Sequence, residues 1–380
     1  MSQDIAPFTL NVAESALEDL RRRLDGARWP DSETVDDWTQ GAPLAKVRAL
    51  CEHWRHRYDW RRCEAKLNET GQFKTTIDGL GIHFLHVRSP HPDAMPLIVT
   101  HGWPGSVLEF MKVIEPLTNP TAHGGSAGDA FHVVAPSLPG FGFSDKPTGT
   151  GWGVPRIAAA WIALMERLGY TRWVAQGGDW GAGVTTAIGV IRPPAVAAIH
   201  VNMPLVFPDA EDLKLPPTPA EQASLAAMAY YQDKDSGYSK QQGTRPQTLG
   251  YGLVDSPVGQ AAWIYEKLWA WTDNNGSPED VLTPDEMLDN IMLYWLPATG
   301  ASSARIYWES FASFASTKLE LPVGVSVFPK EIFRPSRRWA ERRMSNIIHW
   351  GEPAKGGHFA AWEQPQTYVD EIRTCFRTVR

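Results

Sequence analysis

The sequence is poor in cysteine and lacks the residue spacings that metal sites and disulfides require. Its 380 residues include only Cys51, Cys63 and Cys375, which are odd in number, far apart and without a C-x-x-C pair. No H-E-x-x-H motif or metal-spaced cluster occurs, and no G-x-G-x-x-G fingerprint follows a predicted strand. We therefore expect a reducing, cytoplasmic environment, no metal site and no cofactor.

Long hydrophobic runs and an excess of positive charge are also absent. No run approaches the roughly 18 apolar residues of a membrane span, and the formal net charge is −7. The first five residues are acidic and lack the apolar core of a signal peptide. These absences argue against a nucleic-acid partner, a membrane anchor and secretion, and they predict a soluble cytoplasmic protein.

What the sequence does contain is a glycine-rich pentapeptide, Gly-Gly-Asp-Trp-Gly at residues 177–181. It has the G-x-S-x-G spacing of a nucleophile elbow, with Asp179 in the place of serine. A serine that attacked a saturated carbon would form an inert ether, whereas a carboxylate forms an ester that water can cleave. Asp179 therefore indicates substitution at carbon, and the two obvious reactions are epoxide opening and carbon–halogen cleavage.

The surroundings of the pentapeptide fit such an elbow. A short apolar strand at residues 171–176 precedes it, and an apolar helix at residues 183–191 follows. Another apolar strand, at residues 96–100, ends in His-Gly-Trp-Pro. In folds of this kind, the loop after that strand and the residue after the nucleophile supply backbone N–H groups to an oxyanion hole. The predicted donors are Trp103 and Trp180.

An ester on Asp179 needs a base that recruits water, and His358 occupies a suitable position. It lies in a Gly-Gly turn after the last predicted strand, which matches the chain order nucleophile, acid, histidine. A carboxylate must orient this histidine. Two carboxylates are candidates: Glu331 follows the penultimate predicted strand, and Asp209 follows an earlier one. Spacing favours Glu331 as the orienting acid but does not exclude Asp209. Glu352 precedes a proline and is interpreted as a surface charge.

Together these segments resemble an epoxide hydrolase of the microsomal type, in a soluble bacterial form and within the α/β-hydrolase superfamily. The matching segments span nearly the whole chain and lie at residues 7–10, 101–106, 137–144, 177–181, 255–259, 328–331 and 356–361. The resemblance implies that the triad acid is Glu331 rather than Asp209. It also implies that Tyr238 and Tyr307 hydrogen-bond the epoxide oxygen, and that residues 1–70 wrap the catalytic domain.

Epoxide chemistry needs such tyrosines independently, because the ring oxygen is a poor leaving group until a donor polarises it. The expected reaction converts a small apolar epoxide and water to a vicinal diol. Two alternatives stay open: a haloalkane or haloacid dehalogenase that uses the same Asp179, and a catalytically silent receptor. The paired tyrosines favour an epoxide hydrolase over a dehalogenase. The intact triad argues against a catalytically silent receptor. A homodimer is the one assembly we consider.

The order of the predicted elements indicates an α/β-hydrolase fold, with a mostly parallel sheet flanked by helices. A helical region at residues 1–70, clearest at 14–25 and 45–58, precedes a hairpin at residues 73–86. Strands follow near residues 96, 131, 173, 197, 321 and 346. We divide the chain into an N-terminal wrapping segment (1–70), a core (71–203 and 314–380) and an inserted helical lid (204–313).

Overall fold

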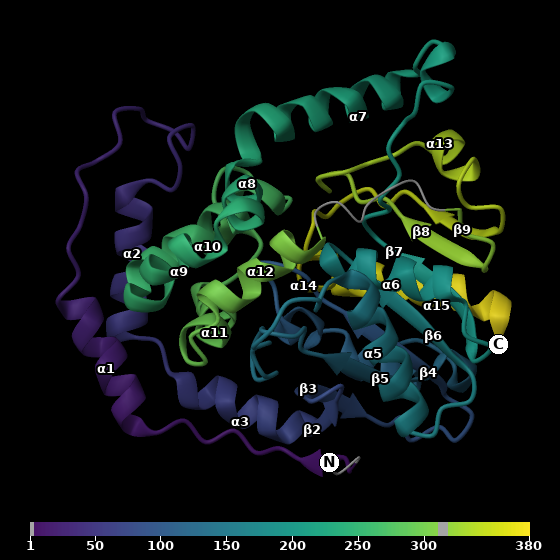
Figure 1. Cartoon of the computed structure of the whole chain (residues 1–380), viewed down its shortest axis with the longest axis horizontal. Helices are drawn as coiled ribbons and strands as arrows, with labels where there is room; N and C mark the ends of the chain where they lie inside the picture. The colour runs from purple at the N-terminus through teal and green to yellow at the C-terminus, as the bar shows by residue number, and fades with distance from the viewer. Residues whose placement is uncertain (1–3, 311–317) are drawn as a thin grey trace.

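The computed structural model describes residues 4–310 and 318–380, and its centre is one nine-stranded sheet (Figure 1). The strands follow the spatial order β1-β2-β3-β5-β4-β6-β7-β8-β9. Their bounds are Ala6–Pro7 (β1), Gln72–Ile77 (β2), Leu80–Val87 (β3), Met95–Thr100 (β4), Phe131–Pro136 (β5), Trp173–Gly177 (β6), Val196–Val201 (β7), Val323–Ser326 (β8) and Ile347–Gly351 (β9). The six strands from β4 to β9 each begin within two residues of the start that the sequence predicts.

One edge of the sheet is antiparallel. β1 pairs with β2, β2 pairs with β3, and β3 pairs with β5, all in antiparallel register. The β2–β3 connection is the tight turn at Asp78 and Gly79, and both residues have positive φ, as a type I′ hairpin turn requires. The predicted hairpin is therefore confirmed.

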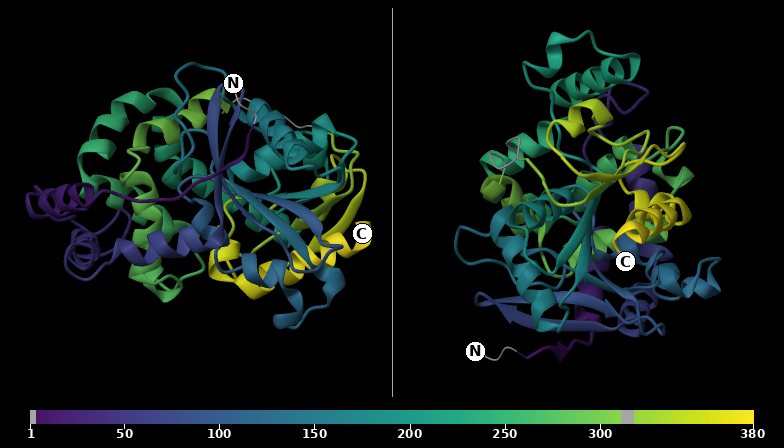
Figure 2. Two further views of the ribbon diagram at one scale, coloured as in Figure 1. Left: turned by 90° about the horizontal axis from the view of Figure 1, so that it is seen from below. Right: turned by 90° about the vertical axis from the view of Figure 1, so that its right-hand side faces the viewer.

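The other strands, from β5 to β9, are parallel and carry helices on both faces. β6 and β8 are buried along their whole length, as expected for strands covered on both sides. Figure 2 shows α15 (Pro365–Phe376) on the face opposite α5 (Val154–Arg167) and α6 (Trp180–Ile191). The predicted fold class, an α/β-hydrolase fold with a mostly parallel sheet flanked by helices, is confirmed.

Between β7 and β8 the chain leaves the sheet and forms a series of helices. Their bounds are Pro219–Tyr230 (α7), Gly237–Thr244 (α8), Pro246–Asp255 (α9), Pro257–Trp271 (α10), Pro284–Trp295 (α11) and Gly300–Ser310 (α12). Two of them, α7 and α11, start with the same Thr-Pro-x-Glu signal, in which the threonine and glutamate form a capping box. The predicted boundary between lid and core, at residues 313 and 314, lies outside the described residues.

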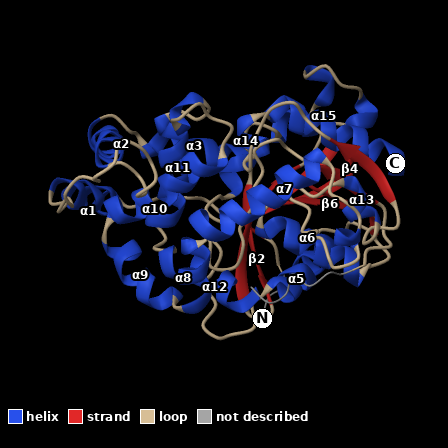
Figure 3. Cartoon of the chain, turned by 90° about the horizontal axis from the view of Figure 1, so that it is seen from above, coloured by secondary structure: helices blue, strands red, loops and turns tan. Residues whose placement is uncertain are grey.

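Three helices come before the sheet: α1 (Glu14–Asp25), α2 (Leu44–His56) and α3 (Trp60–Thr70). Figure 3 shows them beside α8–α12, on one side of the molecule, and α2 packs against α10 and α11. The sequence patterns did not single out α3. Asp59 caps it by accepting a hydrogen bond from the Arg61 N–H, and its buried face packs inward. The short helices of the core are Ile114–Thr118 (α4), Arg337–Glu341 (α13) and Ala360–Glu363 (α14).

Candidate active site

Asp179 lies in a sharp turn between β6 and α6. Its φ of 50° and ψ of −128° are uncommon for a residue with a side chain and store local backbone strain. The turn is also closely packed, since a Cβ on Gly181 would lie 1.9 Å from the Thr100 carbonyl oxygen. Small residues are therefore required around Asp179. The helix begins at Trp180, three residues earlier than the apolar pattern indicated.

His358 and Glu331 lie next to Asp179 and are almost completely buried. His358 Nδ1 is 2.6 Å from Glu331 Oε1, and His358 Nε2 is 3.4 Å from Asp179 Oδ2. Glu331 follows β8 and His358 follows β9, so neighbouring parallel strands bring the two loops together at the same edge of the sheet. The structure thus places the three residues in the order carboxylate, imidazole, carboxylate.

The two carboxylates determine the charge of His358. Burial by itself would lower the pKa of His358, but the negative charge of Glu331 and the contact with Asp179 outweigh it and hold this pKa well above its usual range. His358 is therefore an imidazolium between two carboxylates at neutral pH.

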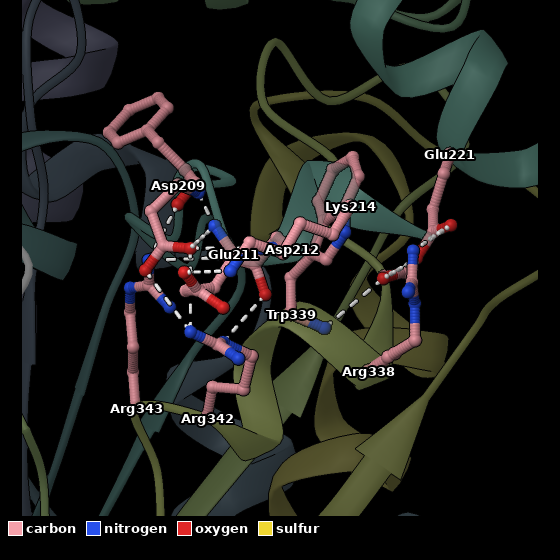
Figure 4. A network of polar contacts seen from close by, with 11 residues as sticks. Asp209, Glu211, Asp212, Lys214, Glu221, Arg338, Trp339, Arg342 and Arg343 are labelled. Carbon is pink, nitrogen blue, oxygen red and sulfur yellow. Dashed lines mark hydrogen bonds and ion pairs between the residues drawn. The ribbon is translucent and has the colours of Figure 1, made fainter. Parts of the chain in front are cut away.

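The two other carboxylates considered for this role lie elsewhere. Figure 4 shows Asp209 in a polar network on the segment between β7 and α7, where Arg343 Nη2 contacts it at 3.2 Å. Arg342 joins the same network through Asp212, and a separate pair links Arg338 to Glu221 of α7. Asp209 is accordingly a surface ion-pair partner.

Glu352 is exposed and accepts a hydrogen bond of 2.9 Å from the indole of Trp350. It is a surface charge, as the sequence indicated.

The loop after β4 presents a backbone donor to Asp179. The Trp103 N–H donates a hydrogen bond of 2.8 Å to Asp179 Oδ1. Burial lowers the pKa of His101 to about 4, so its neutral ring donates from Nδ1 to the Gly102 carbonyl and accepts at Nε2 from Leu138 N–H. These bonds hold the loop in place. Trp180 is the first residue of α6 and directly follows Asp179 in the turn.

Two tyrosines from separate helices contact each other in the cavity that Asp179 lines. Tyr238 comes from α8 and Tyr307 from α12, and their ring centroids are 5.7 Å apart at an angle of 82°. Tyr238 stacks on Trp103, whereas Tyr307 makes an edge contact with Trp180. Burial raises the pKa of both phenols well above the usual value, so both stay protonated. The Tyr307 hydroxyl is buried without a hydrogen-bond partner among the described residues.

Both tyrosines and Asp179 line a cavity of about 240 Å³. Among the described residues, its remaining walls are mostly apolar and include Trp180, Met203, Leu205, Phe207, Tyr231, Gln232 and Phe333. A polar molecule would lose hydration in this cavity without compensation except near Asp179 and the phenols, so the shape favours a small apolar molecule with one polar group.

Sequence reasoning missed three residues near this site. Tyr231 lies on the cavity wall, and its hydroxyl oxygen is 2.9 Å from that of Tyr238. Lys267 is a buried cation over the Tyr238 ring. Glu109 lines a second cavity, of about 10 Å³, together with Asp179 and His358. Only Glu109 carried a sequence signal, as a lone acid in the apolar run at residues 107–110.

The described residues contain no group of three or more His, Cys, Asp or Glu side chains that could hold a metal ion. Within residues 4–310 and 318–380, no helix combines the length and the apolar character that crossing a membrane requires.

Two protein-family models match the chain. The model described as "Epoxide hydrolase N terminus" matches residues 5–110. The model described as "alpha/beta hydrolase fold" matches residues 95–252. Together the two matches cover more than half of the sequence, and they include Trp103 and Asp179.

Individual relatives match over nearly the full length. A protein of Stigmatella aurantiaca, whose name gives epoxide hydrolase as a provisional activity, is 62% identical over 99% of this chain and 86% of its own. Epoxide hydrolase 1 of Sus scrofa is 33% identical over 98% of this chain and 88% of its own. The crystal structure of juvenile hormone epoxide hydrolase from the silkworm Bombyx mori superposes with a TM-score of 0.92 at 28% identity, and the match covers 100% of this chain and 95% of that one.

Proposed function

The chain belongs to the epoxide hydrolase family, and from this membership we propose that it converts an epoxide and water to a vicinal diol through a covalent ester on Asp179. The observation that carries the proposal is the position of one carboxylate, Asp179, in a cavity that two buried phenols share. A carboxylate can open the ring, and the phenols can supply the proton that the departing oxygen needs.

The first step is attack of Asp179 on a ring carbon of the epoxide. A new bond forms between the carboxylate oxygen and this carbon, while the bond from the carbon to the ring oxygen breaks. Tyr238 and Tyr307 hydrogen-bond the oxygen and transfer a proton to it as its negative charge develops. Both hydroxyls carry their protons at neutral pH before the reaction starts, because burial raises the pKa of each phenol.

The second step is hydrolysis of the ester. Formation of the ester removes the charge of Asp179, so His358 keeps only one of its two carboxylate partners and its pKa falls. His358 then releases a proton. This proton returns to the phenol that protonated the ring oxygen, so both phenols are again protonated. Neutral His358, oriented by Glu331, accepts one proton from water as the water oxygen bonds to the ester carbonyl carbon. The bond between this carbon and the diol oxygen then breaks, the diol oxygen takes the second proton of the water, and Asp179 is again a carboxylate.

Negative charge appears on the ester oxygen during the second step, and the backbone can stabilise it. The Trp103 N–H already contacts Asp179 Oδ1 at 2.8 Å, and Trp180 at the start of α6 is the second donor that we propose. One fixed donor of this kind is typically worth about 3 to 4 kcal/mol in the transition state.

A single turnover in water labelled with oxygen-18 tests the ester intermediate. With enzyme in excess over a styrene-type epoxide, the first label should enter Asp179 rather than the diol, because water attacks the enzyme's carbonyl carbon. Mass spectrometry of the peptide that contains Asp179 measures this. Label found only in the diol after one turnover would show direct hydration of the epoxide and overturn the proposal.

A further inference from the structure

Lys267 is a buried cation in α10, next to the candidate site. Only 4% of its side chain is exposed, although an ammonium group is almost never fully buried without partners. Its Nζ lies 2.5 Å from Asp235 Oδ1 and 2.9 Å from Glu266 Oε2. Asp235 also accepts a hydrogen bond of 2.7 Å from the Trp271 indole, so the position of the ion pair is well defined.

The same ammonium group lies over an aromatic ring of the site. Lys267 Nζ is 4.7 Å from the centroid of the Tyr238 ring and 5.5 Å from that of Trp271. Both distances are within the range of a cation–π contact, which is strongest where water is excluded. Because Tyr238 also stacks on Trp103, its ring has little freedom to move.

Tyr231 contacts the other end of Tyr238. The two hydroxyl oxygens are 2.9 Å apart, and Tyr231 belongs to a π-helical turn, η5 (Tyr231–Asp235), that also contains Asp235. π-helical turns are rare and often occur at functional sites. This turn therefore supplies both the hydroxyl beside the Tyr238 oxygen and the carboxylate that holds Lys267.

These contacts distinguish Tyr238 from Tyr307. Among the described residues, Lys267 lies over the ring of Tyr238, whereas no cation lies over the ring of Tyr307. A phenol that gives up its proton gains negative charge, which a cation over the ring stabilises. The two tyrosines therefore have unequal support for proton donation.

We propose that Lys267, held by Asp235, is a positioning residue that fixes and polarises Tyr238, and that the contact with the Tyr231 hydroxyl fixes the position of the Tyr238 oxygen. Tyr238 is then the principal proton donor to the ring oxygen, and Tyr307 mainly holds that oxygen by a hydrogen bond. This inference rests on the proposed function, because it concerns the step in which Asp179 is alkylated.

A double-mutant cycle tests the role of Lys267. Lys267→Met should slow alkylation by roughly tenfold in the wild-type and Tyr307→Phe backgrounds, since a desolvated cation–π contact is lost. The same change in the Tyr238→Phe background should have little effect, because no proton donor remains under the cation. Stopped-flow tryptophan fluorescence measures alkylation, and ester hydrolysis should stay within about twofold. Lys267→Arg, which keeps the charge, should restore most of the rate.

The matched control is Lys240→Met, which removes an exposed lysine of α8 whose ammonium contacts the backbone carbonyl of Gln232. Equal slowing by Lys267→Met with and without the Tyr238 hydroxyl would show a purely structural role and overturn the proposal. If Lys267→Met does not fold, Tyr231→Phe gives the same test with a single hydroxyl removed. If the wild-type enzyme forms no alkyl-enzyme, the proposed function is wrong. If it forms one, but the effects of Lys267→Met and Tyr238→Phe on the alkylation rate are independent, only the role of Lys267 is wrong.

Discussion

The Nε2 atom of His358 lies 3.4 Å from the Oδ2 atom of Asp179, so an imidazolium faces the carboxylate that we propose as nucleophile. In the proposed mechanism, alkylation of Asp179 removes the negative charge from this pair. This change in charge would link the two half-reactions, because the event that ends the first step also lowers the pKa of His358, the base that the second step requires.

Replacement of His358 by glutamine should separate the two steps. Asp179 still attacks the epoxide in His358→Gln, but no base activates water, so the alkyl-enzyme should accumulate. Intact-protein mass spectrometry should show an added mass equal to that of the epoxide. Early and complete loss of alkylation in this variant would contradict the division of roles.

Glu331→Gln should stall the same step more weakly, because it loosens the imidazole without removing it. The variant also leaves His358 with one charged partner instead of two. Asp209→Asn is the matched control, since Asp209 lies in the surface network of Figure 4 and its loss should leave both rate constants within about twofold. A strong kinetic defect in Asp209→Asn would reopen the choice of acid.

Replacement of the tyrosines should affect only the first step. Each lost hydrogen bond to developing charge is worth about 1.5 to 3 kcal/mol, so each single Phe variant should slow alkylation within a range of roughly 10- to 150-fold. The effect of Tyr238→Phe should be the larger of the two, because we propose Tyr238 as the principal proton donor. The double variant should be close to background, and ester hydrolysis should change little in all three. Rapid-quench measurement of alkyl-enzyme checks this expectation.

The same variants discriminate between epoxide and halide chemistry. A double Phe variant that still opened epoxides at the wild-type rate would contradict the assignment of the tyrosines. Halide release from haloalkanes of matching size, measured with the wild-type protein, would then become the decisive assay for a dehalogenase.

The packing around the elbow predicts a large effect of one methyl group. Gly181→Ala places a Cβ against the Thr100 carbonyl, and the backbone must move, so we expect about 4 kcal/mol or more of destabilisation or no soluble protein. Gly252→Ala in α9 is the matched control, because nothing lies within 4 Å of its Cβ. It should be neutral or stabilising by up to about 1 kcal/mol. Urea unfolding measures both, and similar values would refute the packing argument.

Glu109 predicts a pH dependence of stability. Burial raises the pKa of its carboxyl from 4.5 to about 8. The folded state therefore holds a proton that the unfolded state loses, and the stability contributed by Glu109 falls as the pH rises from about 5 to 8. Glu109→Gln cannot ionise, so it should be more stable than wild type at pH 8 and similar at pH 5.

Urea unfolding at both pH values measures this difference. Glu69→Gln, an exposed position at the end of α3, controls for the change of side chain. An equal effect of Glu109→Gln at the two pH values would show that the carboxyl does not change its protonation between them.

The sequence by itself was sufficient for much of the fold and for the candidate nucleophile. Apolar runs marked six parallel strands, because strands buried on both faces need continuous hydrophobic residues. The glycines around Asp179 marked the elbow, because a turn this close to Thr100 excludes a Cβ. Short-range sequence signals report such local requirements directly.

The choice between Glu331 and Asp209 depended on more than spacing. Both follow predicted strands, and local patterns favoured Glu331 only moderately. The resemblance to a known family selected Glu331, and the structure places its carboxylate 2.6 Å from His358 and Asp209 among arginines. The order of the strands in the sheet decides which of the loops after them lie side by side. A local sequence pattern does not contain this order.

Only the tertiary structure decided the electrostatics of the site. Lys267 and Tyr238 lie in different helices, and no sequence pattern connects them. Only the structure shows that the Lys267 ammonium lies 4.7 Å from the centre of the Tyr238 ring. Their contact depends on how α8 and α10 pack and on a π-helical turn that places Asp235. The pKa of His358 has the same origin, since burial and charge act through space between residues that are far apart in the chain.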